Sequence, residues 1–195
     1  MAFWTDINDN QEDPKRNFRF KVTINGFNNA AQPGGNDTLV WWAKKVQKPN
    51  FTVAEVKHVF LGHTFYYPGK TEWQEITMTL VDPVTPNAMA ILSKIHEESG
   101  YELPNKEKLK SQGKKKSANA LGAVVIEQID ADDNTVEKWT LQNPFLKKVT
   151  FSDLDYENDD LTTVDIAFRY DWATCATGIA GDDKPFFASN GPVAG

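Results

Sequence analysis

Alternation of large apolar and polar side chains marks several segments of the chain as β-strands with one buried face. The longest such region covers residues 149–172, and its second half alternates without a break. The apolar positions there are Val164, Ile166, Phe168, Tyr170 and Trp172, and between them lie Asp165, Ala167, Arg169 and Asp171. A period of two puts the two sets on opposite faces of a strand, so one face is buried and the other is wet.

A partner for this strand is predicted just before it. Residues 149–156 are less regular in phase, and the polar link at residues 157–160 predicts a hairpin between the two strands. Because the apolar face is strongly aromatic, other parts of the chain must cover it. Further strands are predicted at residues 18–24, 38–46, 74–80, 124–129 and 135–141.

An aromatic segment at residues 56–67 is extended, and Pro68 and Gly69 predict the turn that follows it. Tyr66 and Tyr67, together with Trp41, Trp42 and Trp73, suggest two alternatives. The five rings form a platform for a sugar, or they belong to a core or subunit interface, which is the commoner use of such rings.

One helix is predicted at residues 86–99. Thr85 can cap it, Pro86 suits its first position, and Gly100 follows its end. Ala88, Ile91, Leu92 and Ile95 fall on one stripe, which predicts a helix laid on the sheet.

These elements predict a mainly β protein, an antiparallel β-sandwich or barrel with one flanking α-helix. Residues 1–16 are predicted to be an N-terminal arm, residues 17–173 the β domain, and residues 174–195 a Gly-rich C-terminal tail. Within the domain, residues 104–120 carry six lysines and almost nothing apolar, which predicts a mobile basic loop.

Composition excludes several classes of protein. The chain has 195 residues and 40% hydrophobic content, so it can build a core. Its net charge of −6 does not suit a protein that binds nucleic acid by neutralising phosphate charges. No apolar run is long enough to span a bilayer, and the acidic N-terminus does not resemble a secretory signal. A single cysteine suits a reducing cytoplasm.

No catalytic or metal site is expected, and no cofactor. His58, His63 and His96 lack zinc-ligand spacing, and on one regular extended run His58 and His63 would point to opposite faces. Acids alternate from Asp153 to Asp159, but Asn158 stands where a calcium loop needs Gly, which favours a solvated turn. Motifs for a nucleophile or a phosphate cradle are missing, so the sequence predicts a protein that is not an enzyme.

The polar faces of three strands, residues 19–23, 75–79 and 163–171, allow two arrangements. Joined edge to edge between copies, such strands would form a closed wall with a wet inner surface. The alternative is an ordinary sandwich with one face in solvent.

In their order, these features resemble the tail tube proteins of contractile-tailed bacteriophages, a family related in fold to type VI secretion inner-tube proteins. The resemblance runs from about residue 17 to residue 172. It rests on an opening FRFKVTI strand, the segment VFLGHTFYYPGKTEWQEITMTLVDP, the helix after it, a hairpin, an N-P-F link and the closing LDYENDDLTTVDIAFRYDW.

The resemblance implies a structural subunit that forms six-fold rings stacked as a hollow tube, which conducts viral DNA during injection. The implied partners are other copies of the chain, a surrounding tail sheath protein, a baseplate and a tail terminator at the ends, and DNA passing without sequence-specific binding. The implied location is the virion tail, after synthesis in the host cytoplasm. The alternatives are the inner tube of a type VI-like secretion machine and a monomeric β-sandwich binding module.

The resemblance also implies roles for particular residues. Polar strand faces line the channel of such tubes, and the lumen candidates here are Glu75, Thr77, Thr79, Thr163, Asp165, Arg169 and Asp171. The arm that reaches neighbouring subunits corresponds to His63, Thr64, Phe65, Tyr66, Tyr67, Pro68, Gly69, Lys70, Thr71 and Glu72. An acidic lumen would repel phosphates and let DNA slide.

Overall fold

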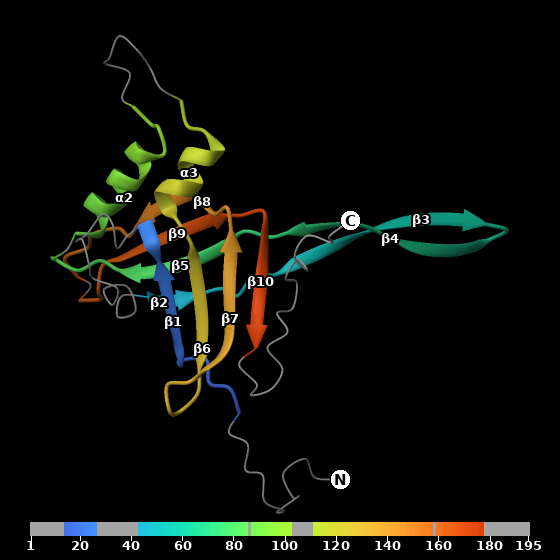
Figure 1. Cartoon of the computed structure of the whole chain (residues 1–195), viewed down its shortest axis with the longest axis horizontal. Helices are drawn as coiled ribbons and strands as arrows, with labels where there is room; N and C mark the ends of the chain where they lie inside the picture. The colour runs from blue at the N-terminus through green and yellow to red at the C-terminus, as the bar shows by residue number, and fades with distance from the viewer. Residues whose placement is uncertain (1–13, 27–42, 86, 103–110, 158, 178–195) are drawn as a thin grey trace, which may run out of the picture.

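Two four-stranded antiparallel sheets form the body of the protein (Figure 1). The computed structural model describes residues 14–26, 43–85, 87–102, 111–157 and 159–177. Sheet I has the strand order β1 (Phe20–Ile24), β6 (Val124–Ile129), β7 (Thr135–Gln142), β10 (Trp172–Thr177). Sheet II has the order β2 (Ala43–Val46), β5 (Ile76–Val81), β9 (Thr163–Arg169), β8 (Phe145–Phe151).

The core lies between the two sheets, whose strands cross in Figure 1. The alternating apolar residues of each sheet turn inward, as the sequence predicts. Val22 and Ile126 in sheet I and Met78, Ile166 and Phe168 in sheet II are each at most 3% exposed. The predicted β-sandwich is therefore confirmed.

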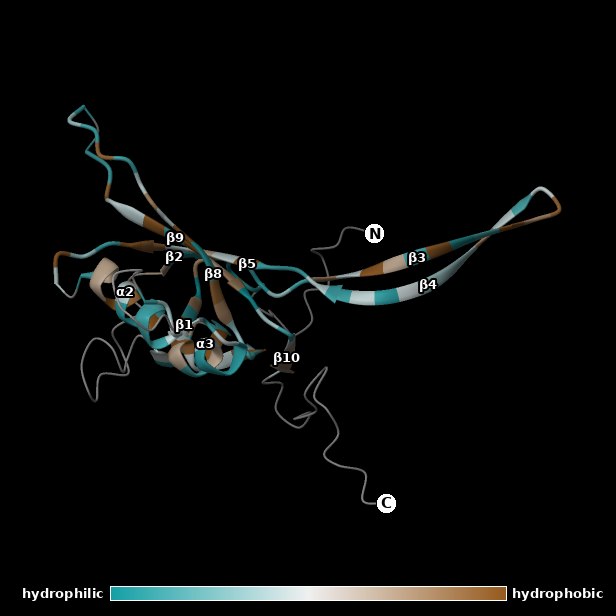
Figure 2. Ribbon diagram, turned by 90° about the horizontal axis from the view of Figure 1, so that it is seen from above, coloured by the Kyte–Doolittle hydropathy of each residue, from teal (hydrophilic) through white to brown (hydrophobic). Residues whose placement is uncertain are grey.

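A long hairpin leaves this body. It consists of β3 (Phe51–Phe60) and β4 (His63–Trp73), and both figures show it extending far beyond the sheets (Figures 1 and 2). The turn lies at Leu61 and Gly62, which both have positive φ, as a two-residue hairpin turn requires. The predicted turn at Pro68 and Gly69 is wrong.

Pro68 and Gly69 lie instead at an irregularity within β4. The register shifts between Val53 and Glu55 on the opposite strand, so β4 carries one extra residue there. A side chain on Gly69 would come 2.8 Å from the carbonyl oxygen of Ala54, so this close approach requires glycine.

In the described part of the chain, two helices cover one end of the sandwich (Figure 2). They lie on the same side of sheet II as sheet I does. α2 (Ala88–Glu98) confirms the predicted helix, and its four stripe residues are buried. Its N-cap is Asn87 rather than Thr85, because the Asn87 side chain accepts hydrogen bonds from the amides of Met89 and Ala90.

The second helix, α3 (Lys114–Leu121), lies in the segment predicted as a basic loop. It forms because Ala120 and Leu121 are buried in the core, while its three lysines remain exposed. In the described part of the chain, the expectation of a single flanking helix is therefore corrected to two, α2 and α3. Residues 103–110, with the other lysines of the predicted loop, lie outside the described residues.

The longest alternating run is divided between the two sheets. β9 ends at Arg169, and β10 begins at Trp172 and pairs with β7 in sheet I. Sheet I then continues to Thr177, so residues 174–177 of the predicted tail form a strand. Before β9, the partner strand β8 ends at Phe151, and the predicted strand residues Leu154 and Tyr156 lie exposed in the connecting loop.

Candidate functional site

The wet face of sheet II brings together six of the seven lumen candidates. β5 and β9 are neighbours, with Thr79 opposite Asp165 and Thr77 opposite Ala167. The hydroxyl of Thr79 donates a hydrogen bond of 2.6 Å to Asp165. Glu75, Thr77 and Thr79 form one column, and Thr163, Asp165 and Arg169 form the column beside it.

Charges of both signs lie on this face. Arg169 donates to Glu72 at 2.9 Å, and Lys147 is paired with Glu75, whose pKa it lowers by hydrogen bonding. The face is therefore mixed in charge and not the acidic wall considered from the sequence.

Two cations of this face, Lys45 and Lys148, were not among the sequence candidates. Together with Thr77, Thr79, Thr150 and Asp165 they line a shallow hollow of about 390 Å³. The β2 and β8 strands that carry them are irregular in register, so simple alternation does not identify these lysines.

The seventh candidate, Asp171, has a different environment. It lies at the corner between β9 and β10, where it accepts hydrogen bonds from Lys114 and Asn143 at 2.8 and 2.9 Å. The ammonium group of Lys114 lowers the pKa of Asp171. These contacts tie Asp171 to the start of α3 and to the β7–β8 turn.

The ten predicted arm residues make up most of β4, and they are all exposed. One face of the outer part of the hairpin is apolar apart from two imidazoles. Opposed pairs on that face are Phe60 with His63, His58 with Phe65, and Val56 with Tyr67. His58 and His63 thus lie on the same face, and the expectation of opposite faces is wrong because the chain turns between them.

The aromatic platform, the less favoured of the two alternatives for these rings, is not assembled by the described residues. Tyr66 and Tyr67 point to opposite faces of the hairpin. Trp73 packs at the core, 5.3 Å from Phe51 and 6.0 Å from Tyr170 between ring centroids. Trp41 and Trp42 lie outside the described part of the chain.

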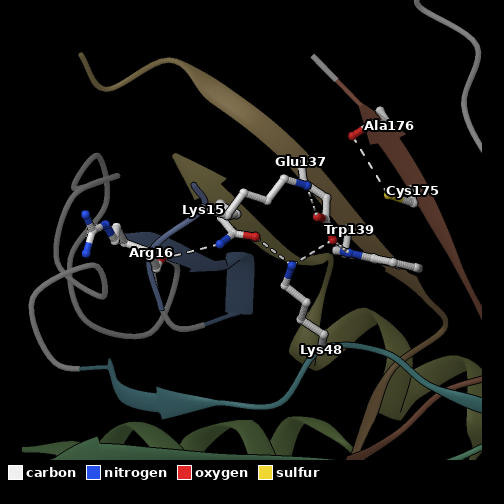
Figure 3. Close-up of polar contacts among 8 residues, drawn as sticks. Lys15, Arg16, Lys48, Glu137, Trp139, Cys175 and Ala176 are labelled. Atoms are coloured by element: carbon white, nitrogen blue, oxygen red, sulfur yellow. Dashed lines mark hydrogen bonds and ion pairs between the residues drawn. The ribbon is translucent and has the colours of Figure 1, made fainter. Parts of the chain in front are cut away.

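A cluster of polar side chains lies at the end of the sandwich where the chain passes from β2 to the hairpin (Figure 3). Lys15 and Lys48 each donate to Glu137 at 2.9 Å, and the Trp139 indole also donates to it. Lys48 donates in addition to Gln128 at 2.6 Å. Burial raises the pKa of Glu137, but the three hydrogen bonds together outweigh it and lower the pKa to about 2.

The described residues contain no group of three His, Cys, Asp or Glu side chains that could hold a metal ion. His96 instead contacts Gln112 at 3.1 Å and stacks on Tyr101. No helix among the residues described is long and apolar enough to cross a membrane.

Comparison with known proteins identifies the fold. No protein-family model and no curated protein matches the sequence. A chain from the sheath/tube terminator of an extracellular contractile injection system (PVC) has a TM-score of 0.60 and 16% identity over 86% of this chain and 100% of its own length. A chain from the baseplate of the anti-feeding prophage has a TM-score of 0.59 and 13% identity, covering 85% of this chain and 97% of that one.

An Hcp protein is also similar, with a TM-score of 0.51 and 10% identity over 86% of this chain and 98% of its own length. The chain has a tail-tube fold. The tail-tube fold expected from the sequence is confirmed.

Proposed function

We propose that this chain is a structural subunit that assembles into six-fold rings stacked as the hollow tube of a contractile injection machine. The role is structural and not enzymatic. The observation that carries the proposal is the β3–β4 hairpin, which is long, largely apolar on one face and left exposed by the rest of the described chain.

The hairpin supports self-assembly on energetic grounds. An isolated two-stranded ribbon is marginal in water, and large apolar side chains stay exposed along it, with Leu61 82% and Phe60 59% exposed. Burying a side chain of this size contributes about 1.5–3 kcal/mol. A neighbour that covers this face would therefore stabilise the hairpin, and a copy of the same chain is the proposed neighbour.

Open sheet edges also support assembly. In the described part of the chain, β2 and β8 each pair on one side only, and so do β1 and β10. If copies joined along the edges of sheet II, the wet face would become a continuous inner wall. We infer that Glu75, Thr77, Thr79, Thr163, Asp165 and Arg169 line the channel, whereas Asp171 lies near its end.

Phage is the proposed setting, with viral DNA in the channel, a sheath around the tube, and a baseplate and terminator at its ends. In that setting the tube belongs to the virion tail. A type VI-like secretion tube is the alternative supported by the similarity to an Hcp protein. A terminator is a second candidate because one similar chain comes from a sheath/tube terminator.

Negative-stain microscopy of the concentrated protein tests the proposal. Regular hollow rods are expected for a tube subunit, because ring closure and stacking use two different interfaces. Isolated rings that do not stack would favour the terminator. Scattered single particles and a monomeric sedimentation profile at high concentration would contradict assembly and favour a monomeric binding module.

A further inference from the structure

Both edges of sheet II carry the same local feature, a β-bulge at a pair of lysines. On β2, Lys44 is the extra residue between two register pairs, and Lys45 follows it. On β8, Lys147 is the extra residue, and Lys148 follows it. Sheet II therefore presents two adjacent lysines and a break in the ladder at each of its borders.

All four lysines are exposed, and Lys45, Lys148 and the Glu75-bound Lys147 lie on the side of the proposed channel. Lys147 is held by Glu75. Lys45 and Lys148 have no ion-pair partner in the described residues, and they point into the same hollow as Thr77 and Asp165. Their charges are therefore only partly compensated by the described residues.

The edges of sheet I differ. β1 and β10 pair with their neighbours in unbroken register. β10, with the sequence WATCAT, has no charged residue, and Lys21 of β1 is bonded to Asp133 at 2.6 Å. The lysine bulge is thus a property of sheet II and not of every edge in the protein.

We propose that these lysines oppose edge-to-edge joining of sheet II between free copies of the chain. Lysines and bulges on edge strands disfavour pairing with another strand. Joining β8 of one copy to β2 of the next would put the two lysine pairs on neighbouring strands, which lie about 4.8 Å apart. Like charges repel over about 10 Å at 0.1 M salt. Pairing of β8 with β2 of the next copy is fast only when salt screens the lysine charges or carboxylates bind them. This inference rests on the proposed tube function.

A salt dependence follows from the repulsion. Added salt screens like charges, so assembly of the free protein speeds up as ionic strength rises. An assembly that depended on ion pairs between subunits would slow down under the same change. The sign of the salt effect therefore separates the two cases.

Assembly kinetics of a matched set of variants test the inference. Lys45→Gln/Lys148→Gln removes two edge charges, and Lys94→Gln/Lys115→Gln removes two exposed charges from the helices. Both change the net charge equally. Lys45→Arg/Lys148→Arg keeps the edge charge. Light scattering gives the lag before assembly, microscopy identifies rods, and circular dichroism confirms that each variant is folded.

The edge Gln variant is expected to shorten the lag about three- to tenfold and to lose most of the salt dependence, because opposed like charges weaken strand pairing. The helix Gln variant and the Arg variant should behave like the wild type. Rods that form with equal lags in both Gln variants, or slower assembly of the wild type in added salt, would overturn this inference and leave the proposed tube function standing. No assembly of any variant at any salt concentration would overturn the proposed function as well.

Discussion

Glu137 is the residue on which three separate parts of the chain converge. Lys15 comes from the segment before β1, Lys48 from the link between β2 and β3, and Trp139 from the same strand as Glu137. Its side chain is only 12% exposed, so the cations replace the solvation that burial removes. Glu137, on β7 of sheet I, therefore holds the segment between β2 and β3 from which the hairpin starts.

Glu137→Gln is expected to lower the free energy of unfolding by about 1–3 kcal/mol at neutral pH, because two lysines lose their shared carboxylate. Urea denaturation measures the change. Glu127→Gln is the control, since Glu127 forms a single more exposed pair with Lys138 and should cost under about 1 kcal/mol. Equal effects of the two substitutions would contradict a special role for Glu137.

The pH dependence of stability follows from the same residue. Folding lowers the pKa of Glu137 from 4.5 to about 2. The ionised carboxylate therefore stabilises the folded state fully at pH values above the pKa that Glu137 has in the unfolded chain. It is lost as the pH falls from about 4.5 towards 2. The difference in unfolding free energy between the wild type and Glu137→Gln should shrink over that interval. A difference that stays constant between pH 5 and pH 2.5 would contradict the assignment.

At the scale of elements, the β3–β4 hairpin is the part of the fold that we propose to carry assembly. Its two faces differ, and Phe65 and Tyr66 are neighbours in sequence that point to opposite faces. Both side chains are exposed in the subunit, so replacing either has little effect on the stability of the monomer.

Phe65→Ser should raise the protein concentration needed for rod formation at least about tenfold, because a large apolar contact is lost from the interface. Tyr66→Ser is the matched control on the more polar face and should have a smaller effect. Pelleting assays over a concentration series measure both variants. If Tyr66→Ser is the more damaging substitution, the apolar face is not the one that docks.

Local patterns in the sequence predict most strands and α2, because their alternation or stripe reflects burial within one chain. The pattern cannot show a change of partner, so residues 164–172 look like one strand although Tyr170 and Asp171 turn the chain from sheet II into sheet I. The local pattern also cannot show that the apolar residues of β3 and β4 remain outside the core. The register of β5 and β9 then aligns six candidates that the sequence could place only on separate strands.

At the scale of the whole molecule, the hairpin and α2 lie on opposite sides of the body in both views (Figures 1 and 2). A contact made by the hairpin of one copy on the body of the next joins two different surfaces, so it is head to tail unless two copies exchange their hairpins reciprocally. A head-to-tail contact that closes gives a ring, and one that does not close gives a helical filament. In the proposed tube, sheet II of successive copies would lie in one wall.

If that wall encloses a channel, Asp165 is near its centre, since it lies on β9 between β5 and β8. Asp165→Lys would add positive charge to a face that already carries Lys45, Lys148 and Arg169. Tubes of this variant should retain short duplex DNA more strongly than wild-type tubes, and the retention should fall steeply with salt. Co-sedimentation of labelled DNA with preformed tubes measures it.

Two controls make the result specific to the channel. Asp165→Asn also removes the charge of Asp165 and alters its bond with Thr79, but adds no cation, so it should retain less DNA than Asp165→Lys. Asp132→Lys makes the same change of charge in the β6–β7 turn of sheet I, away from the proposed wall. A duplex blocked at both ends by bulky groups reaches only outer surfaces, so it should bind Asp165→Lys tubes no more strongly than Asp165→Asn tubes. Equal retention of the short duplex by Asp165→Lys and Asp132→Lys would remove Asp165 from the channel wall and leave the wet face of sheet II on the outside of the assembly.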